Sequence, residues 1–166
     1  MKNKAIFLLV LFSFFCNAES LQFLSVQEFK ESITLSQNKK AFLDNYLRTI
    51  NELDSEVNSI IATYDSSEIY KAYVYGRNKE WQGVPIIIKD NIDSLGLPNT
   101  AGSLSMLDNF PRRDAHIVTR LKKTGFLVVG KANLSEWANF RGRNSVSGWS
   151  SSVSYTHLTL PTTYTV

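Results

Sequence analysis

The stretch from Gly83 to Asn91, with the sequence GVPIIIKDN, constrains the fold more than any other part of the chain. Its three consecutive isoleucines, residues 86–88, are too short a run for a helix with a defined apolar face. They suit a strand buried on both faces, as the strands of parallel sheets are. Pro85 fits at the start of such a strand, where its missing N–H breaks no ladder bond. We therefore expect a buried parallel strand that ends in Lys89.

The position of Lys89 has a functional and a purely structural interpretation. In open α/β sheets, ligands bind outside the carboxyl ends of the strands, which is where this lysine falls. Loss of contact with water disfavours the ammonium form of a lysine and leaves an amine that can act as a base. The alternative is a solvated lysine at the end of a strand, since most lysines lie on the protein surface.

Residues 25 to about 76 show helical periodicity. Ser25 and Glu28 have the spacing of a capping box at the start of a first helix. A longer helix is predicted from apolar residues at helical spacing: Phe42, Leu43, Tyr46, Leu47, Ile50, Leu53, Val57, Ile60 and Ile61. A third, weaker helix is expected through Ile69 and Tyr73, ending before Gly76.

A second strand follows the isoleucine stretch after a loop and a helix. The loop, residues 91–111, is rich in Gly, Pro, Asn and Ser. Asp114 is in place to cap the helix, and Gly125 to end it. The apolar run 126–130, FLVVG, then predicts a second buried strand. Strand, helix and strand in this order form a parallel βαβ unit.

Beyond this unit, Asn133 and Glu136 indicate the start of another helix, which leads into Trp137 and Phe140. The expected fold class is α/β. A helical N-terminal portion precedes the first βαβ unit of a mostly parallel sheet that is covered by helices and truncated.

The first 18 residues predict a signal peptide. Two lysines precede an apolar segment, residues 5–15, that is too short to span a bilayer. We expect cleavage after Ala18 and therefore an exported protein, either periplasmic or extracellular. A lipoprotein anchor on Cys16, which Phe15 makes a poor fit to a lipobox, and a short buried helix are the alternatives.

Charge and cysteine content exclude several classes of function. Of 18 Lys and Arg, two lie in the predicted signal, so 16 remain against 15 Asp and Glu, a net charge of +1. Without a polybasic run we expect no nucleic-acid partner, and no later apolar segment is long enough to span a membrane. Cys16 is the sole cysteine, so no disulfide is expected in the mature chain. No cluster of His, Cys and carboxylates has metal-ligand spacing, so neither a metal nor another cofactor is expected.

The two histidines offer little support for histidine-based catalysis. His116 falls in an amphipathic helix, where a surface or packing role is expected, and His157 lies in the C-terminal tail. The sequence therefore offers no good candidate for the histidine of a Ser-His-Asp triad. Removal of Cys16 with the signal peptide also excludes a Cys-His dyad.

Four motifs in a fixed order resemble those of the amidase signature family. Residues 83–93, GVPIIIKDNID, are similar to its lysine motif. The segments 100–103 (TAGS), 130–140 (GKANLSEWANF) and 147–151 (SGWSS) follow in the family's order. Upstream, residues 46–61 resemble its N-terminal helix, so the resemblance covers roughly residues 25–151. Four ordered motifs are far more specific than any one of them.

This resemblance implies hydrolysis of a carboxamide by a Ser–cis-Ser–Lys triad, with a small-molecule or peptide amide as substrate. An unprotonated lysine takes a proton from a bridging serine, which activates the nucleophilic serine. Only Lys89 corresponds to a triad member in this sequence. The two serines are expected beyond the last residue, so the chain itself is expected to be inactive. Ser150, Ser151 and Ser152 belong to a segment that precedes the catalytic serines in this family.

The C-terminal tail departs from the family pattern. From about Val153 it has five threonines, no charged residue and none of the expected Gly-Gly-rich sequence. We predict a signal peptide over 1–18, the N-terminal part of an amidase domain over 19–152 and a non-native tail over 153–166. A native strand around Tyr155 to Leu160 is the alternative for the tail.

Two further functions share some of these features. Transamidating amidotransferases have a component that carries the same motifs, although an export signal conflicts with transfer-RNA chemistry in the cytoplasm. A non-catalytic binding module is the other alternative. The oligomeric state does not follow from the sequence.

Overall fold

The computed structural model describes residues 24–140, 149–151 and 154–155. The predicted signal peptide therefore lies outside the described residues, as does the predicted tail apart from Ser154 and Tyr155. The chain folds into α2 (Val26–Leu35), α3 (Lys39–Val57), β1 (Ile60–Thr63), α4 (Ser66–Gly76), β2 (Pro85–Lys89), η1 (Leu104–Met106), α5 (His116–Thr124), β3 (Leu127–Ala132), η2 (Glu136–Asn139), β4 (Trp149–Ser150) and β5 (Ser154–Tyr155).

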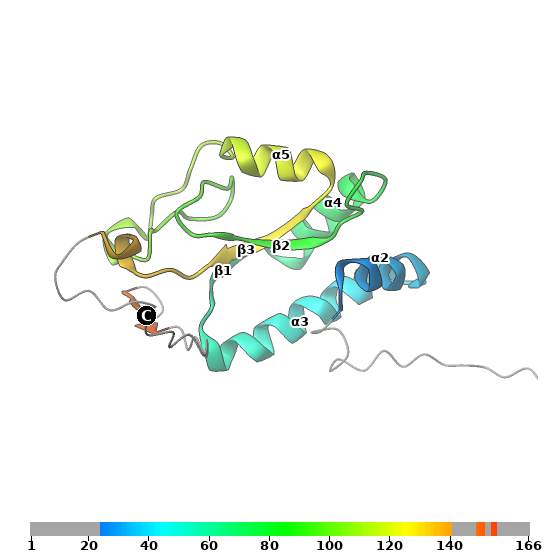
Figure 1. Ribbon diagram of the computed structural model, residues 1–166, viewed down its shortest axis with the longest axis horizontal. Coiled ribbons are helices and arrows are strands. Elements are labelled where there is room, and N and C mark those ends of the chain that lie inside the picture. Colours follow the sequence, from blue (N-terminus) through cyan, green and yellow to red (C-terminus); the bar gives the residue numbers. More distant parts are fainter. Residues whose placement is uncertain (1–23, 141–148, 152–153, 156–166) are drawn as a thin grey trace, which may run out of the picture.

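A three-stranded sheet with the order β1-β3-β2 forms the centre of the fold (Figure 1). Strands β2 and β3 are parallel and connected through α5, which confirms the predicted βαβ unit and the α/β fold class. Strand β1 pairs with the other side of β3 in antiparallel orientation. The short strands β4 and β5 form a separate antiparallel pair.

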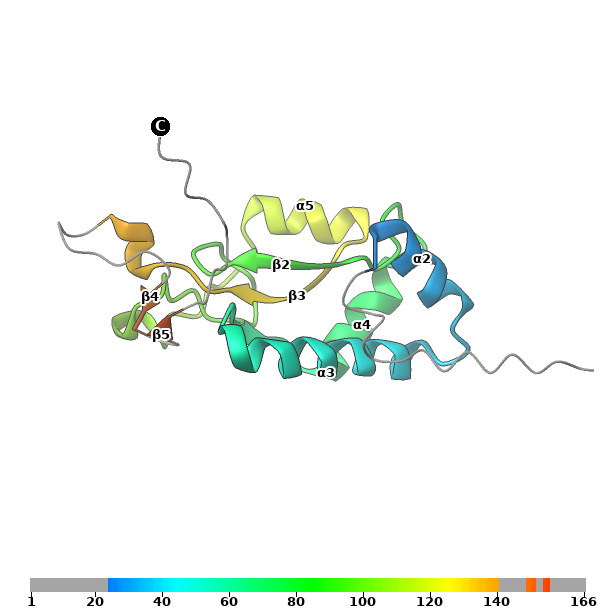
Figure 2. The same cartoon turned by 60° about the horizontal axis from the view of Figure 1, so that its bottom comes forward.

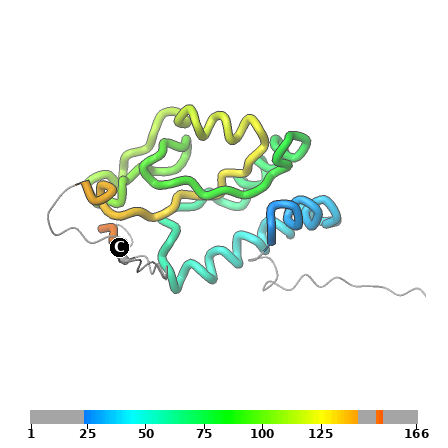
Figure 3. The backbone as a smooth tube through the Cα atoms, in the orientation of Figure 1, coloured from blue at the N-terminus to red at the C-terminus, as the bar shows by residue number. Residues whose placement is uncertain are grey.

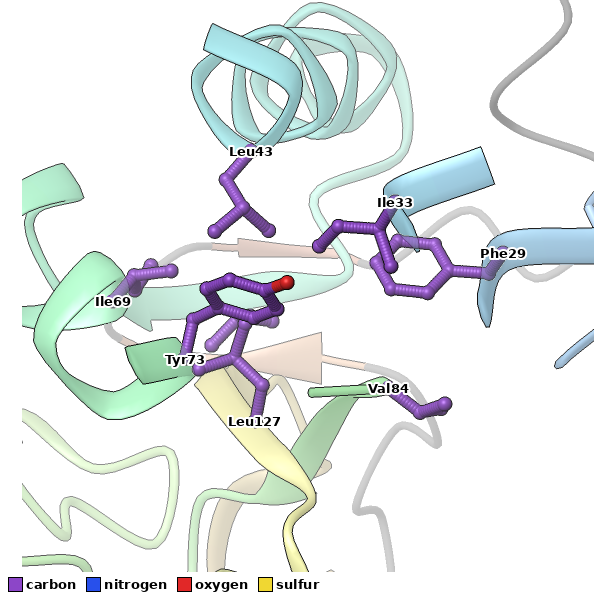
Figure 4. Close-up of a cluster of buried hydrophobic side chains, with 8 residues drawn as sticks. Phe29, Ile33, Leu43, Ile69, Tyr73, Val84 and Leu127 are labelled. Atoms are coloured by element: carbon purple, nitrogen blue, oxygen red, sulfur yellow. The ribbon is translucent and has the colours of Figure 1, made fainter. Parts of the chain in front are cut away.

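Helices cover the two faces of this sheet, with α5 on one side and α2 and α3 on the other (Figure 1). On the α2–α3 side, helices and strands share one apolar core. Figure 4 shows its side chains converging from α2, α3, α4, β3 and Val84, the residue just before β2. Its buried members are Phe29, Ile33, Leu43, Ile69, Tyr73, Val84, Leu127 and Val129. A smaller core under α5 contains Ile88, Val118 and Val128. The side chains of β3 thus alternate between the two faces of the sheet, as expected of a strand: Leu127 and Val129 belong to the larger core and Val128 to the smaller one.

The N-terminal helices begin as predicted, but the long one ends earlier. Ser25 and Glu28 form the reciprocal capping box. Helix α3 stops at Val57 because Asn58 adopts a left-handed conformation with φ of 53°. The Asp54 carboxylate then accepts hydrogen bonds from the backbone N–H groups of the two residues that follow Asn58. Ile60 and Ile61 consequently belong to strand β1, and their predicted place in the helix is wrong.

Strand β2 is less enclosed than its isoleucines predict. Ile88 is buried, but Ile87 is 37% exposed, so burial on both faces is not observed. The reason is that β2 lies at the edge of the described sheet, with β3 as its partner there.

Two predicted helix starts are also corrected. Helix α5 begins without a side-chain cap, because the Asp114 carboxylate accepts hydrogen bonds from the Leu95 backbone N–H and the Lys122 ammonium instead. Gly125 ends this helix with φ of 98°, as predicted. The segment after Asn133 forms only the 3-10 turn η2, in which Trp137 and Ala138 have left-handed backbone angles. Among the described helices, none is long and apolar enough to cross a membrane.

Candidate functional site

The segments that carry the four sequence motifs meet at the carboxyl ends of β2 and β3. Figures 2 and 3 show the loop after β2 returning alongside the end of β3 and η2. Hydrogen bonds join these segments: the Asp90 N–H donates to the Ala132 carbonyl over 3.0 Å, and the Trp137 N–H donates to the Ala101 carbonyl over 2.9 Å. Motifs that are tens of residues apart in sequence therefore build one site.

Lys89 is the last residue of β2, as predicted, and its side chain is exposed. Its backbone is held in the ladder opposite Ala132, and its carbonyl accepts a hydrogen bond from the Ile92 N–H over 3.0 Å. The expected dry environment around this lysine is not observed in the structure. Lys89 instead has an accessible side chain on a fixed backbone.

Asp90, the next residue, is completely buried. Its Oδ2 atom accepts hydrogen bonds from the Thr100 N–H (3.1 Å), the Thr100 hydroxyl (2.6 Å) and the Gly102 N–H (3.3 Å). Its Oδ1 atom has no hydrogen-bond partner among the described residues. The lysine motif and the Thr-Ala-Gly-Ser motif are thus joined by one buried carboxylate.

Lys131 is the charged group opposite that carboxylate, and it is completely buried. Its Nζ atom lies 3.4 Å from Asp90 Oδ1 and donates hydrogen bonds to the carbonyls of Asp90 (2.8 Å) and Pro98 (3.0 Å). Burial lowers the pKa of Lys131, and the neighbouring Asp90 carboxylate acts in the opposite direction.

Lys131 lies in one of the four motifs, but its sequence context predicts no role for it. The one local signal was a charged residue that directly follows the apolar run 126–130. That pattern equally predicts a strand that has reached solvent, as happens at Lys89. Which lysine is buried depends on the loop that covers the end of β3, and local periodicity carries no information about it.

The fourth motif packs behind the Thr-Ala-Gly-Ser turn. Ser150 is completely buried, and the Ser151 N–H donates to the Gly102 carbonyl over 2.9 Å. The Ser151 hydroxyl accepts from the Leu104 N–H (2.9 Å) and lies 3.1 Å from a Glu136 carboxylate oxygen. The Ser151 hydroxyl is thus engaged in contacts with the Thr-Ala-Gly-Ser turn and η2. Ser152 lies outside the described residues.

Gly102 allows this close packing. It has φ of 71°, and a Cβ at this position would lie 2.9 Å from the Leu134 carbonyl oxygen and 3.1 Å from Ser150 Cβ. Any other residue would meet both backbone strain and a backbone atom that cannot move away easily.

Two other potential sites are formed by residues outside the four motifs. His116 is exposed at the first turn of α5. A surface hollow of about 680 Å³ lies where α3 meets the β1–α4 junction, and none of the four motifs lines it. Within the described parts of the chain, no group of three or more His, Cys, Asp or Glu side chains could hold a metal ion.

Comparison with known proteins identifies the class to which this fold and site belong. The model of the Amidase family matches residues 41–150. The chain therefore belongs to the amidase family, whose members include hydrolases of amides.

Individual relatives are consistent with this assignment. The chain is 34% identical over 121 residues to a probable amidase of Arabidopsis thaliana, covering 67% of this chain and 23% of the relative. It is 36% identical over 119 residues to one of the subunits of glutamyl-tRNA(Gln) amidotransferase from Methanosarcina barkeri, covering 70% of this chain and 24% of that protein. The native peptide amidase of Stenotrophomonas maltophilia superposes with a TM-score of 0.69 at 33% identity, over 81% of this chain and 29% of that structure.

These coverages show that the chain spans about a quarter of the length of the curated relatives it matches. The matched residues include β2 with Lys89, and most of the helical N-terminal portion.

Proposed function

We propose that these residues form the N-terminal part of a longer enzyme, called here the parent enzyme, that hydrolyses carboxamides with Lys89 as its base. The observation that carries this proposal is the placement of Lys89. Its side chain is exposed at the carboxyl end of a parallel strand, on a backbone fixed by the buried residue that follows it. The family membership supports an amide as substrate.

In the proposed reaction, neutral Lys89 Nζ accepts a proton from a bridging serine hydroxyl. That serine accepts the proton of a nucleophilic serine as the nucleophile attacks the amide carbonyl carbon. The C–N bond then breaks, the amine leaves with a proton, and water hydrolyses the acyl-enzyme to a carboxylic acid. Both serines are proposed to come from the part of the parent enzyme that follows the residues matched here. Substrates are proposed to be small-molecule or peptide amides, and the similarity to a peptide amidase favours the latter.

Substitution of Lys89 by alanine in the parent enzyme tests the role of this lysine. Loss of the base is expected to lower turnover of a simple aryl amide by about 10²- to 10⁴-fold. Lys123→Ala, which removes an exposed lysine from the last turn of α5, is the matched control and should leave turnover unchanged. Equal turnover in wild type and Lys89→Ala would show that Lys89 is structural. The 166-residue chain alone is expected to hydrolyse no amide, and measurable turnover by it would refute the placement of the serines.

The amidotransferase relatives suggest a second candidate, transfer of amide nitrogen to another acceptor instead of water. The export signal proposed for residues 1–18 argues against it. Secretion of the parent enzyme with a new N-terminus after Ala18 would support hydrolysis outside the cytoplasm. Retention of the intact N-terminus in the cytoplasm, together with nitrogen transfer to an acylated acceptor, would support the second candidate.

A further inference from the structure

The charged pair behind Lys89 has features that the proposed reaction does not use. Asp90 and Lys131 are both completely buried; Asp90 directly follows β2, and Lys131 lies near the end of β3. Burial of two charges carries a large desolvation cost, which their attraction offsets only when further hydrogen bonds complete the arrangement. Here five hydrogen bonds join the pair to the loop after β2, residues 90–103. Three connect the Asp90 carboxylate to Thr100 and Gly102, and two connect Lys131 to the carbonyls of Asp90 and Pro98.

A bulge in β3 brings Lys131 to this position. Ile86 and Ile87 are consecutive, yet they pair with Val128 and Gly130, so β3 contains one extra residue between them. Because an extra residue reverses the alternation of side chains, Lys131 shares a face with its partner Ile88 and lies under the loop. Without this extra residue, Lys131 would lie on the same face of the sheet as Leu127 and Val129, away from the loop.

Lys89 lies on the face opposite to Lys131, because it is adjacent to Ile88 in the same strand. The two lysines are therefore separated by the sheet. Lys131 reaches the base only through the backbone, since it binds the carbonyl of the residue that directly follows Lys89.

We propose that Asp90 and Lys131 act together as positioning residues for the proposed base. Lys131 holds the first residue of the loop and Pro98, and Asp90 holds the turn at Thr100 and Gly102. The pair thereby fixes both the peptide after Lys89 and the turn that packs against Ser151. This inference rests on the proposed function, since it assigns a role in presenting Lys89 to the reacting groups.

Lys131→Met in the parent enzyme tests the inference, because methionine keeps the length of the side chain and removes its three donors. Displacement of the base by a fraction of an ångström is expected to lower kcat by about 10²-fold, with KM unchanged within about threefold. Lys39→Met is the matched control. The Lys39 ammonium also donates to two backbone carbonyls, those of Thr34 and Ser36, but at the α2–α3 connection. Its kcat should equal that of the wild type.

Thr100→Val is the milder variant, in case Lys131→Met fails to fold. It removes the hydroxyl that donates to Asp90 and keeps the shape of the side chain. The same hydroxyl accepts a hydrogen bond from the Gly102 N–H over 3.0 Å, so the variant loses two hydrogen bonds. This loss is expected to lower kcat by about fivefold at constant KM. Thr49→Val, at a buried threonine that bonds within α3, is its control and should leave kcat unchanged.

The outcomes separate the two proposals. Full kcat per folded molecule in Lys131→Met and in Thr100→Val would overturn the positioning role, even if the melting temperature falls. A rise in KM alone would also overturn it, because the loop would then bind substrate instead of orienting the base. Wild-type activity of Lys89→Ala would instead refute the proposed function itself.

Discussion

Two lysines at the carboxyl ends of neighbouring strands have opposite environments. Lys89 ends β2 with an exposed side chain, whereas Lys131, one register position away on β3, is completely buried against Asp90. The exposed lysine is available for chemistry, and the buried one holds two segments of the chain together. The comparison shows that strand position alone does not distinguish an exposed lysine, here the proposed base, from a buried structural one. What distinguishes them is which face the side chain occupies and what covers it.

The largest expected difference between the two lysines is in stability. Lys131→Met leaves the Asp90 carboxylate buried without its counter-ion, so we expect local opening of the loop to become easier by about 3–5 kcal/mol. Lys89→Met changes an exposed side chain and should alter it by less than about 0.5 kcal/mol. Hydrogen exchange of the peptide that contains Thr100 and Gly102, measured in the parent enzyme, gives both values.

A double variant sharpens this result. Asp90→Asn removes the other charge, so combining it with Lys131→Met should cost less than the sum of the single substitutions, by about 1–3 kcal/mol. Strict additivity would mean that the two groups do not act as a pair.

A smaller effect is expected at the glycine where the motifs meet. Gly102→Ala would force a left-handed backbone and bring Cβ to 2.9 Å from the Leu134 carbonyl oxygen, at a cost of about 2 kcal/mol or more. Gly96→Ala is the matched comparison. Its φ is 91°, but the nearest atom to its Cβ would be a ring carbon of Tyr64 at 3.2 Å, so only about 1–2 kcal/mol is expected. Thermal unfolding of the two variants ranks them, and an equal loss would show that contact with Leu134 contributes nothing.

The smallest expected effect is a dependence of stability on alkaline pH. Burial lowers the pKa of Lys131 in the folded chain below the ordinary value of 10.5, to which it returns on unfolding. Between these two pKa values, Lys131 is more often protonated in the unfolded chain than in the folded one. Its contribution to the free energy of unfolding therefore rises with pH in this range and levels off above 10.5. Lys131→Met should remove this slope, whereas Lys123→Met should retain it. Urea unfolding across the alkaline range measures both, and a stability contribution that falls with pH would contradict the assignment.

The sequence alone determined the local elements of this protein. The isoleucine run and the run after Gly125 predicted two parallel strands with a helix between them, because apolar runs of that length bury well in a sheet. Ser25 and Glu28 predicted a capping box, because both partners lie within one helical turn. The order of the motifs predicted the family, which the match over residues 41–150 confirms.

The tertiary structure decided what depends on contacts between distant segments. Ile60 and Ile61 form a strand because β3 offers them a partner, although their spacing continued a helical pattern. Asp114 binds Leu95 and Lys122 instead of capping its helix. The burial of Lys131 depends on a bulge in β3 and on a loop from another part of the chain, and its charge is tolerated there because Asp90 and two carbonyls meet it.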